Sequence, residues 1–344
     1  MKTTEGRGQM SGLRFVDVCA GAGGLALGLE DAGFEPVLLL DKESVSCDTL
    51  RTNRSRWQVL QADLLDFAPT RYQETYDVDL LSAGLPRVKS GATVARDETE
   101  AELRLLEATV YLAHAVQPRA LLIENVPGLV NAPDFEPIRD FIRKELDHLG
   151  YRFRWFVLNA ADFGVPQDRR QGVLVALREQ YFDAFHPPEP TVREHLSVGR
   201  ALLRSMTVGG WRDADRWAAQ ALTVAPTLVG GSDRRGGADL GPTGTKKAWA
   251  RMGVDGGTVA DEVPGPDFVW DPETGRHGMV RITTDQAALL QGFPSDWAFA
   301  GRKTARYRQI GHASPPPVGR ALGSAIRAAL GESVTSVADY TSAP

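Results

Sequence analysis

The sequence contains few cysteines and no long apolar run, and each absence excludes a class of protein. Only Cys19 and Cys47 occur among 344 residues, which is too few for a disulfide framework or a four-thiolate zinc site. A stretch of about 18 uninterrupted apolar residues is missing, which excludes a membrane-spanning helix. Residues 1–12 lack the apolar segment of a secretory signal peptide. We therefore expect a reduced, cytoplasmic protein without a metal site.

A large excess of either charge is also missing. The formal net charge is -5, which excludes a protein coated in basic residues but leaves room for a local basic groove. Hydrophobic residues make up 42% of the chain, enough to bury a substantial core. The length predicts one large domain or two modest ones.

Strands and helices alternate along the first half of the chain. Short apolar runs typical of buried strands occupy residues 13–18, 36–40, 79–83, 120–123, 154–158 and 172–177. Helical spacing of apolar residues follows Gly24 and recurs over residues 100–115 and 135–149. This alternation predicts an α/β fold with a doubly wound parallel sheet.

The pattern weakens in the second half, where glycine and proline concentrate. Residues 187–280 show little periodicity and include the loop-like run GGSDRRGG at 230–237. Residues 283–292 and 316–330 then have helical spacing again. We predict a first domain formed by residues 13–186 and 281–330, a small irregular domain at 187–280, and flexible termini at 1–12 and 333–344.

A glycine-rich turn, Gly21-Ala22-Gly23-Gly24, connects the first predicted strand to a helix. Such a turn lets a ligand approach the backbone closely at a helix N-terminus. Asp41, at the end of the next strand, suits a ribose diol. This spacing alone fits NAD, FAD, S-adenosylmethionine or a purely structural turn.

The residue types in and after the turn narrow this choice. The segment Asp17-Val18-Cys19-Ala20-Gly21-Ala22-Gly23-Gly24-Leu25, followed by Asp41 and then by Asp63-Leu64, resembles the cofactor site of S-adenosylmethionine methyltransferases. The resemblance implies that Asp41 holds the ribose and Asp63 the adenine amino group. The implied cofactor-binding residues are Asp17, Cys19, Ala20, Gly21, Gly23, Gly24, Leu25, Asp41, Lys42, Asp63, Leu64, Pro86, His312 and Ser314.

Four later segments, in order, resemble motifs of the DNA cytosine-5 methyltransferases. They are IENVPGL at 123–129, FGVPQDR at 163–169, ALLQGFP at 288–294 and YRQIG at 307–311. The resemblance implies that S-adenosylmethionine is the cofactor, that duplex DNA is the partner, and that residues 187–280 form a target recognition domain in the major groove. It also implies that Glu124 contacts the ring of a flipped cytosine and that Arg169 steadies this base.

In that family a cysteine thiolate adds to C6 of the base and activates C5 for methylation. The corresponding segment here is Ala83-Gly84-Leu85-Pro86-Arg87-Val88-Lys89-Ser90, with Arg87 where the resemblance places the nucleophile. A guanidinium cannot be deprotonated to attack carbon. Gln171 and His312 also replace an expected arginine and asparagine. We interpret Cys19 and Cys47 as structural, so neither substitutes for the missing thiol.

Three interpretations therefore stay open. The chain is a catalytically silent, DNA-binding or regulatory homologue that assists a partner methyltransferase or restriction endonuclease. Alternatively, it is an active S-adenosylmethionine-dependent methyltransferase that uses a route without cysteine, supported by Glu124 or the Arg87 loop. In the third, a second chain supplies the thiol. A dinucleotide-dependent oxidoreductase would leave the Glu124-Asn125-Val126 segment without a role.

Candidate contacts to DNA are basic or amide residues near the predicted base site and in the irregular domain. They are Lys89, Gln167, Arg234, Arg235, Lys246 and Lys247. Arginine and lysine in a loop-rich domain can contact phosphates and base edges. Acidic residues are nearly as numerous there, so a solvated charged surface is the competing interpretation.

Overall fold

The computed structural model describes residues 12–88, 96–230 and 237–331, except for the side chains of residues 96–98. The predicted DNA contacts at Lys89, Arg234 and Arg235 lie outside this part, as do the predicted flexible termini apart from Gly12. Among the described helices, none is long and apolar enough to span a membrane.

A seven-stranded sheet organises the first lobe, with strand order β3-β2-β1-β4-β5-β8-β6. Its strands are β1 (Leu13–Val18), β2 (Phe34–Asp41), β3 (Val59–Gln61), β4 (Leu80–Gly84), β5 (Ala120–Asn125), β6 (Tyr151–Asn159) and β8 (Arg170–Arg178). The pairs from β3 to β5 are parallel, so the carboxyl ends of these strands meet at one edge. β7 (Gln167–Asp168) and β9 (Ala225–Pro226) form a separate small parallel pair.

The doubly wound α/β fold is confirmed with a mostly parallel sheet, in which β8 is the exception to the predicted parallel arrangement. This strand runs antiparallel to both β5 and β6. The reason lies in the connection, because residues 160–169 between β6 and β8 hold only a 3-10 turn and the short β7. A parallel return requires a crossover of a dozen or more residues, usually a helix. The start of β8 therefore lies at the same sheet edge as the carboxyl ends of β4 and β5.

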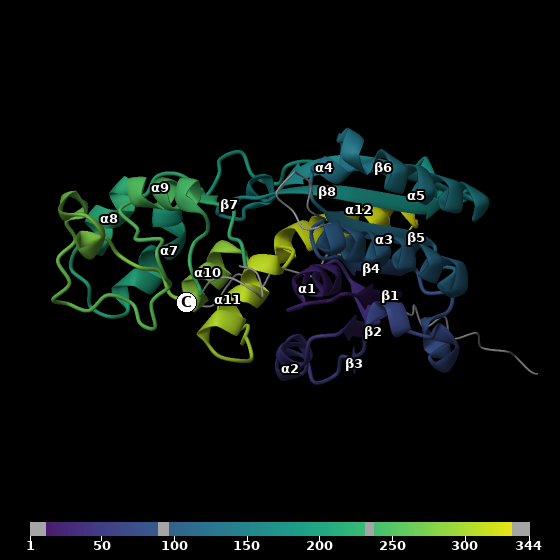
Figure 1. Cartoon of the computed structure of the whole chain (residues 1–344), viewed down its shortest axis with the longest axis horizontal. Helices are drawn as coiled ribbons and strands as arrows, with labels where there is room; N and C mark the ends of the chain where they lie inside the picture. Colours follow the sequence, from purple (N-terminus) through teal and green to yellow (C-terminus); the bar gives the residue numbers. More distant parts are fainter. Residues whose placement is uncertain (1–11, 89–95, 231–236, 332–344) are drawn as a thin grey trace, which may run out of the picture.

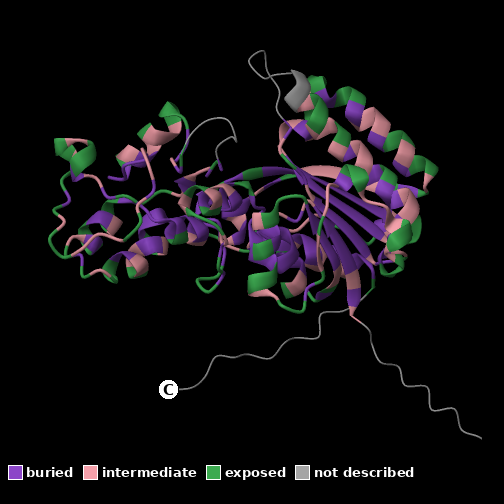
Figure 2. Ribbon diagram, turned by 60° about the horizontal axis from the view of Figure 1, so that its bottom comes forward, coloured by how far each residue is buried: buried purple, intermediate pink, exposed green. Residues whose placement is uncertain are grey.

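Helices cover both faces of this sheet, and alternate strand residues enter two apolar clusters. Phe15 and Leu122 belong to the cluster that includes α1 (Gly24–Asp31) and α12 (Pro316–Ala329). Val16 and Ile123 belong to the cluster that includes α3 (Arg96–Val116) and α5 (Glu136–His148). Figure 2 shows the resulting buried strands between partly exposed helices. The remaining helices of this lobe are α2 (Ser44–Asn53), α4 (Gly128–Asn131) and α6 (Glu179–Phe182).

The predicted irregular region is more helical than its sequence suggested. It contains α7 (Val198–Thr207), α8 (Ala214–Gln220) and α9 (Thr243–Arg251), which lie together on the left in Figure 1. Trp217 and Trp249 are fully buried among them, and the indole of Trp217 donates to the carbonyl of Met252 at 3.0 Å. Tertiary packing around these tryptophans stabilises short helices whose local periodicity is weak.

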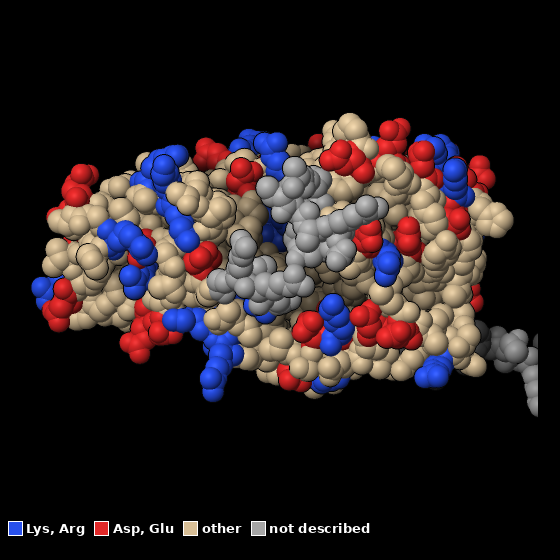
Figure 3. All heavy atoms as spheres, in the orientation of Figure 1, with Lys and Arg blue, Asp and Glu red and all other residues tan. Residues whose placement is uncertain are grey.

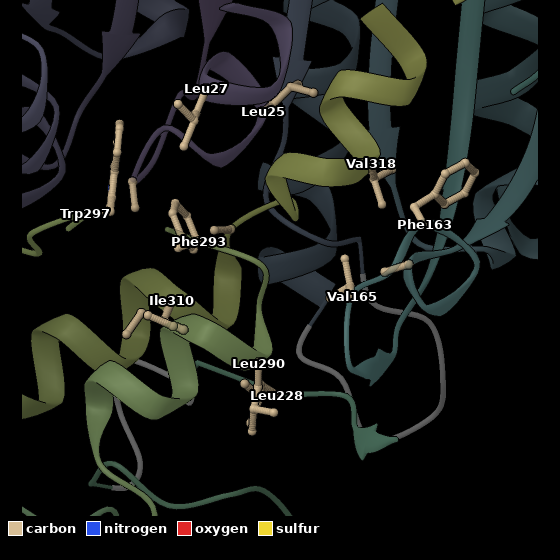
Figure 4. Packing of buried hydrophobic residues seen from close by; sticks show 14 of the residues in the cluster. Leu25, Leu27, Phe163, Val165, Leu228, Leu290, Phe293, Trp297, Ile310 and Val318 are labelled. Carbon is tan, nitrogen blue, oxygen red and sulfur yellow. The ribbon is translucent and has the colours of Figure 1, made fainter. Parts of the chain in front are cut away.

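The last helices connect the two lobes. We call the predicted irregular region, residues 187–280, the insert. α10 (Thr284–Leu290) and α11 (Lys303–His312) lie between the insert and the sheet, and α12 packs on α1 (Figure 1). One continuous apolar cluster extends from α1 and α12 to the insert tryptophans. Figure 4 shows Leu228 of the insert beside Leu290 of α10. The insert therefore packs against the edge of the sheet at which the carboxyl ends of the parallel strands lie.

Candidate functional site

The glycine turn after β1 contains residues with positive backbone φ angles. Cys19, Gly21 and Gly23 have φ values of 53°, 53° and 83°. A Cβ built on Gly21 meets nothing within 4 Å in the described part of the chain, so this residue borders open space. A Cβ on Gly24 would lie 2.0 Å from the carbonyl oxygen of Ser314, so Gly24 permits close packing of the segment that precedes α12.

Asp41 fixes this turn from the end of β2. Its two carboxylate oxygens accept the backbone N–H groups of Gly21 at 2.8 Å and Glu43 at 2.9 Å. Burial raises the pKa of Asp41, while these two N–H donors oppose the rise. Each carboxylate oxygen retains a second lone pair. A sugar hydroxyl can therefore bind to Asp41 without displacing the turn.

Asp17, near the end of β1, is fully buried beside the turn. One carboxylate oxygen accepts the Ser82 hydroxyl at 2.6 Å, and the other has no partner among the described residues. Burial raises the pKa of Asp17 to about 7, with a further contribution from the nearby Asp41 charge. Together with the open space at Gly21, this unpartnered oxygen fits a site that accepts a polar or cationic ligand group.

The Asp17→Asn variant should gain stability at high pH. Between the unfolded pKa of 3.8 and the folded value of about 7, the folded wild type retains a proton that the unfolded chain has lost. Wild-type stability therefore falls as the pH rises through this window, whereas asparagine stays neutral. We expect the advantage of Asp17→Asn in urea unfolding to be about 2–3 kcal/mol larger at pH 8 than at pH 5.

The exposed acid Asp48 supplies the matched control, because Asp48→Asn should change stability by less than about 0.5 kcal/mol at both pH values. An equal advantage of Asp17→Asn at pH 5 and pH 8 would contradict the raised pKa of Asp17.

The other predicted cofactor residues divide into two groups. Asp63 begins a 3-10 turn, where its carboxylate accepts the N–H of Leu65 at 3.0 Å, and Lys42 is exposed beside Asp41. Leu25 and Leu64 instead contribute their side chains to the apolar core. The side chains of Leu25 and Leu64 therefore do not line the open space at Gly21.

Two predicted cofactor residues lie near the end of α11. The Ser314 hydroxyl is buried and accepts the Gln171 amide at 2.9 Å. His312 is exposed and lies against Gly230, where an added Cβ would approach its ring nitrogen to 2.8 Å. The structure therefore brings His312 to the insert, and its contact with the cofactor stays a prediction.

Asn125 fastens the loop that follows β4 to the end of β5. Its side-chain oxygen accepts the N–H of Val88 at 3.0 Å, and its amide donates to the carbonyl of Pro86 at 3.1 Å. Both residues that flank Arg87 are therefore held by one buried side chain. Glu124, the neighbour of Asn125, pairs in register with Gly84 across the sheet. This arrangement fixes the backbone of Arg87 near Glu124, at the edge of the sheet where the carboxyl ends of β4 and β5 lie.

Arg169 is a fully buried cation in the centre of this arrangement. It donates to three backbone carbonyls, those of Leu228 at 3.0 Å, Gly311 at 3.1 Å and Ala313 at 3.0 Å. Burial lowers the pKa of Arg169, the charge of Arg87 adds to this effect, and Glu124 opposes it. Arg169 therefore connects the insert to the end of α11, and its Nε, which has no partner among the described residues, can serve the predicted contact with a base.

Gln167, two residues earlier, has a similar connecting role. It is fully buried, and its amide donates to the Leu290 carbonyl at 3.1 Å and to the Gln291 side chain at 2.7 Å. Its oxygen accepts the N–H of Leu228 at 2.8 Å. The contact of Gln167 with DNA stays a prediction, which this burial disfavours.

Several buried polar atoms at this sheet edge have no hydrogen-bond partner within residues 12–88, 96–230 and 237–331. They are Asp17 Oδ2, Arg87 Nη2, Glu124 Oε1, Arg169 Nε and Gln171 Oε1. Native proteins leave few such atoms, because each costs about 1–3 kcal/mol. Their positions near the ends of β1 and β5, after β4 and at the start of β8 indicate a site that is completed by polar ligands.

The two cysteines are poorly suited to nucleophilic chemistry. Burial, together with the charges of Asp41, Asp17 and Asp63, raises the pKa of the Cys19 thiol far above its ordinary range. Cys47 is buried on α2, donates to the carbonyl of Asp41 at 3.4 Å, and has a pKa raised to about 11. A thiolate at either position is therefore strongly disfavoured.

The predicted DNA contacts that the structure describes on the insert both lie on α9. Lys247 is exposed, and Lys246 is half-buried and pairs with Asp239 at 3.1 Å. Figure 3 shows lysine and arginine interspersed with acids over this lobe. Among the described residues, no group of three His, Cys, Asp or Glu side chains could hold a metal ion.

The prediction of site residues omitted three positions that organise the site. Asn125 fixes the Arg87 loop, and Ser82 binds Asp17. Gly84 leaves space beside the turn, since among the described residues a Cβ there would meet only the carbonyl oxygen of Cys19, at 3.8 Å. The Glu-Asn-Val segment contained a signal for Asn125, because a buried amide directly after a strand needs partners.

Comparison with known proteins agrees with this geometry. The family described as C-5 cytosine-specific DNA methylase matches this chain over residues 13–224 and 239–328. The chain is 43% identical to the type II methyltransferase M.NaeI of Lentzea aerocolonigenes, over 93% of this chain and 76% of that protein. It is 39% identical to the type II methyltransferase M.NgoMIV of Neisseria gonorrhoeae, over 92% of this chain and 97% of that protein.

Solved structures share the fold at low sequence identity. The Entamoeba histolytica methyltransferase EhMeth superposes with a TM-score of 0.65 at 11% identity, covering 94% of this chain and 100% of that one. The S. pombe Dnmt2 methyltransferase superposes with a TM-score of 0.60 at 16% identity, covering 92% and 98% of the respective chains. From its sequence match along nearly the whole chain, we conclude that this protein belongs to the C-5 cytosine-specific DNA methylase family.

Proposed function

We propose that this chain binds S-adenosylmethionine and duplex DNA but does not methylate cytosine at C5 through a thiolate. The observation that carries the proposal is that Arg87, whose neighbours Pro86 and Val88 are both bonded by Asn125, occupies the position where the family resemblance places the nucleophile. A guanidinium keeps its proton in proteins and cannot add to C6 of the base. The pKa values of Cys19 and Cys47 are raised, so neither supplies a substitute.

The cofactor part of the proposal rests on the space beside the glycine turn. The cofactor supplies the methyl group when bound. In this chain, Asp41 would bind its ribose and Asp63 its adenine amino group, and Asp17 has an unpartnered oxygen for a polar or cationic group. The open space at Gly21 lets the ligand approach the backbone. These residues fit the cofactor although the nucleophile is replaced.

The DNA part rests on the family and on the insert. The relatives named above are type II methyltransferases, and Lys246 and Lys247 place two cations on α9. The predicted partner is duplex DNA, and the predicted protein partner is a restriction endonuclease or a second methyltransferase. In this role the chain acts as a silent or regulatory homologue.

Replacing Asp41 with alanine should weaken S-adenosylmethionine binding about 10- to 100-fold. The variant loses a hydrogen bond to the ribose and leaves the N–H groups of Gly21 and Glu43 without their acceptor. Isothermal titration calorimetry measures this affinity. Asp48→Ala, an exposed acid on α2, is the control and should bind as the wild type does. Unchanged affinity of Asp41→Ala would refute the assigned role of Asp41.

A methyl-transfer assay tests the proposed inactivity. Radiolabelled S-adenosylmethionine is incubated with unmethylated genomic DNA, and the nucleosides are analysed by mass spectrometry. We expect measurable binding of cofactor and DNA with no methylated base. 5-Methylcytosine would refute the proposal, whereas methylation at another atom would favour an active enzyme that uses a route without cysteine.

A further inference from the structure

Gln171 stands where the family resemblance places an arginine, and the structure shows what it contacts instead. It is the second residue of β8 and is fully buried. Its amide donates to the Ser314 hydroxyl at 2.9 Å. Arg169, two residues earlier, donates to the carbonyls of Gly311 and Ala313, at the end of α11 and in its connection to α12. The start of β8 therefore fixes this connection through two buried side chains.

The connection between α11 and α12 also packs on the glycine turn that precedes α1. A Cβ on Gly24 would lie 2.0 Å from the Ser314 carbonyl oxygen and 3.2 Å from its carbonyl carbon. The neighbouring Ala313 carbonyl accepts from both Arg169 and Gln291, which restricts movement of this backbone. Ser314 is therefore held between the start of β8 and the start of α1.

The direction of the hydrogen bond between Gln171 and Ser314 leaves one donor unused. A serine hydroxyl has one proton to donate and two lone pairs that accept. The Gln171 amide uses a lone pair, and nothing in the described part of the chain accepts the hydroxyl proton. Ser314 is buried, so solvent offers this proton little alternative. A buried donor of this kind is complementary to a hydrogen-bond acceptor of a ligand.

The order of the strands indicates which end of the cofactor extends towards Ser314. Asp63 follows β3 and is predicted to bind the adenine, and Asp41 ends β2 and is predicted to bind the ribose. The glycine turn follows β1, the next strand in the sheet. A ligand bound in this order extends its amino-acid end past β1, towards the side of the sheet that includes β8. This end has a carboxylate, which needs donors, and an ammonium group, for which Asp17 has an unpartnered oxygen.

We propose that Gln171 is a positioning residue of the cofactor site. By donating to the Ser314 oxygen, Gln171 directs the hydroxyl proton to the carboxylate at the amino-acid end of the cofactor, and Ser314 contacts that carboxylate. The position at which the family resemblance places an arginine thereby serves recognition of the cofactor. This inference rests on the proposed binding of S-adenosylmethionine.

Isothermal titration calorimetry with two ligands tests this assignment. S-Adenosylhomocysteine has the carboxylate, and its decarboxylated form lacks only that group. We expect the wild type to prefer S-adenosylhomocysteine by at least about 10-fold, because the decarboxylated form leaves the Ser314 donor unpaired. Gln171→Met, which keeps a similar size but has no amide, should lower this preference at least about 3-fold.

Ser314→Ala removes the proposed donor and should lower the preference at least as much. When Ser314 is already alanine, Gln171→Met should change the preference by less than about 1.5-fold, because Gln171 acts through the Ser314 hydroxyl. Gln220→Met, at an exposed position on α8, is the control and should keep the wild-type preference. The ratio of two affinities for one protein does not depend on the fraction that is folded, so a loss of stability does not imitate the effect.

Three results would overturn the inference and leave the proposed cofactor binding intact. One is equal affinity of the wild type for the two ligands. Another is a preference that Gln171→Met or Ser314→Ala leaves unchanged. The third is a full effect of Gln171→Met in protein without the Ser314 hydroxyl, which would show that Gln171 does not act through it. If neither S-adenosylmethionine nor S-adenosylhomocysteine binds, the proposed cofactor binding itself is refuted, and the inference with it.

Discussion

Replacing Arg169 with methionine should lower the free energy of unfolding by about 3–6 kcal/mol. The guanidinium donates to three buried carbonyls, and methionine fills similar space without a donor. Each buried acceptor that loses its partner costs about 1–3 kcal/mol. The acceptors belong to Leu228 on the insert and to Gly311 and Ala313 at the end of α11, so the loss should also loosen the contact between the lobes.

Urea unfolding followed by circular dichroism measures this effect, and Arg170→Met is the matched control. The Arg170 side chain is 70% exposed and its distance to Asp168 is 4.0 Å, so its removal should change stability by less than about 0.5 kcal/mol. A similar small change for Arg169→Met would show that its three contacts contribute little. Faster proteolysis of the insert in Arg169→Met would locate the loss at the connection between the lobes.

Much of the fold could be predicted because its signals are local. The strand at residues 13–18 matches β1, and the predicted strands at 120–123 and 172–177 lie within β5 and β8. The predicted helix at 316–330 agrees with α12 to within one residue. In each case the buried apolar residues that give the signal lie within the segment itself.

The direction of strand β8 and the helices of the insert could not be predicted from the sequence, because they depend on contacts between distant segments. A buried strand has the same apolar run whether its neighbour is parallel or antiparallel. Likewise, α7 to α9 are stabilised by Trp217 and Trp249, which belong to different segments and meet only after folding. Short helices of this kind have little stability of their own.

The candidate site shows the same division. The glycine turn, Asp41 and Glu124 could be identified as a pattern along the chain. The partners of Arg169 could not, because its acceptors at Leu228 and Gly311 are 59 and 142 residues away. The resemblance placed Arg169 at the base, whereas the structure uses most of its donors to join the two lobes.

Introducing a thiol at position 87 should create the ability to form a covalent complex with DNA. We expect wild-type protein to form no denaturation-resistant complex with duplex DNA that contains 5-fluorocytosine, even with S-adenosylmethionine present. Arg87→Cys should form one. A thiolate can add to C6, and fluorine at C5 blocks the proton loss that normally releases the enzyme sulfur. Denaturing gel electrophoresis detects the complex as a slower band that contains both protein and labelled DNA.

The geometry of the loop supports this gain. Because Asn125 binds the backbones of Pro86 and Val88, the substitution leaves the position of residue 87 fixed beside Glu124. Arg87→Ser is the control, since its hydroxyl is of similar size but a far weaker nucleophile, and it should give no complex. A random-sequence duplex library in which every cytosine is fluorinated avoids the need to know the target. A complex with wild-type protein would show that another nucleophile serves this site. Its absence from Arg87→Cys, in protein that still binds the library, would show that a thiol at position 87 is not sufficient for the addition.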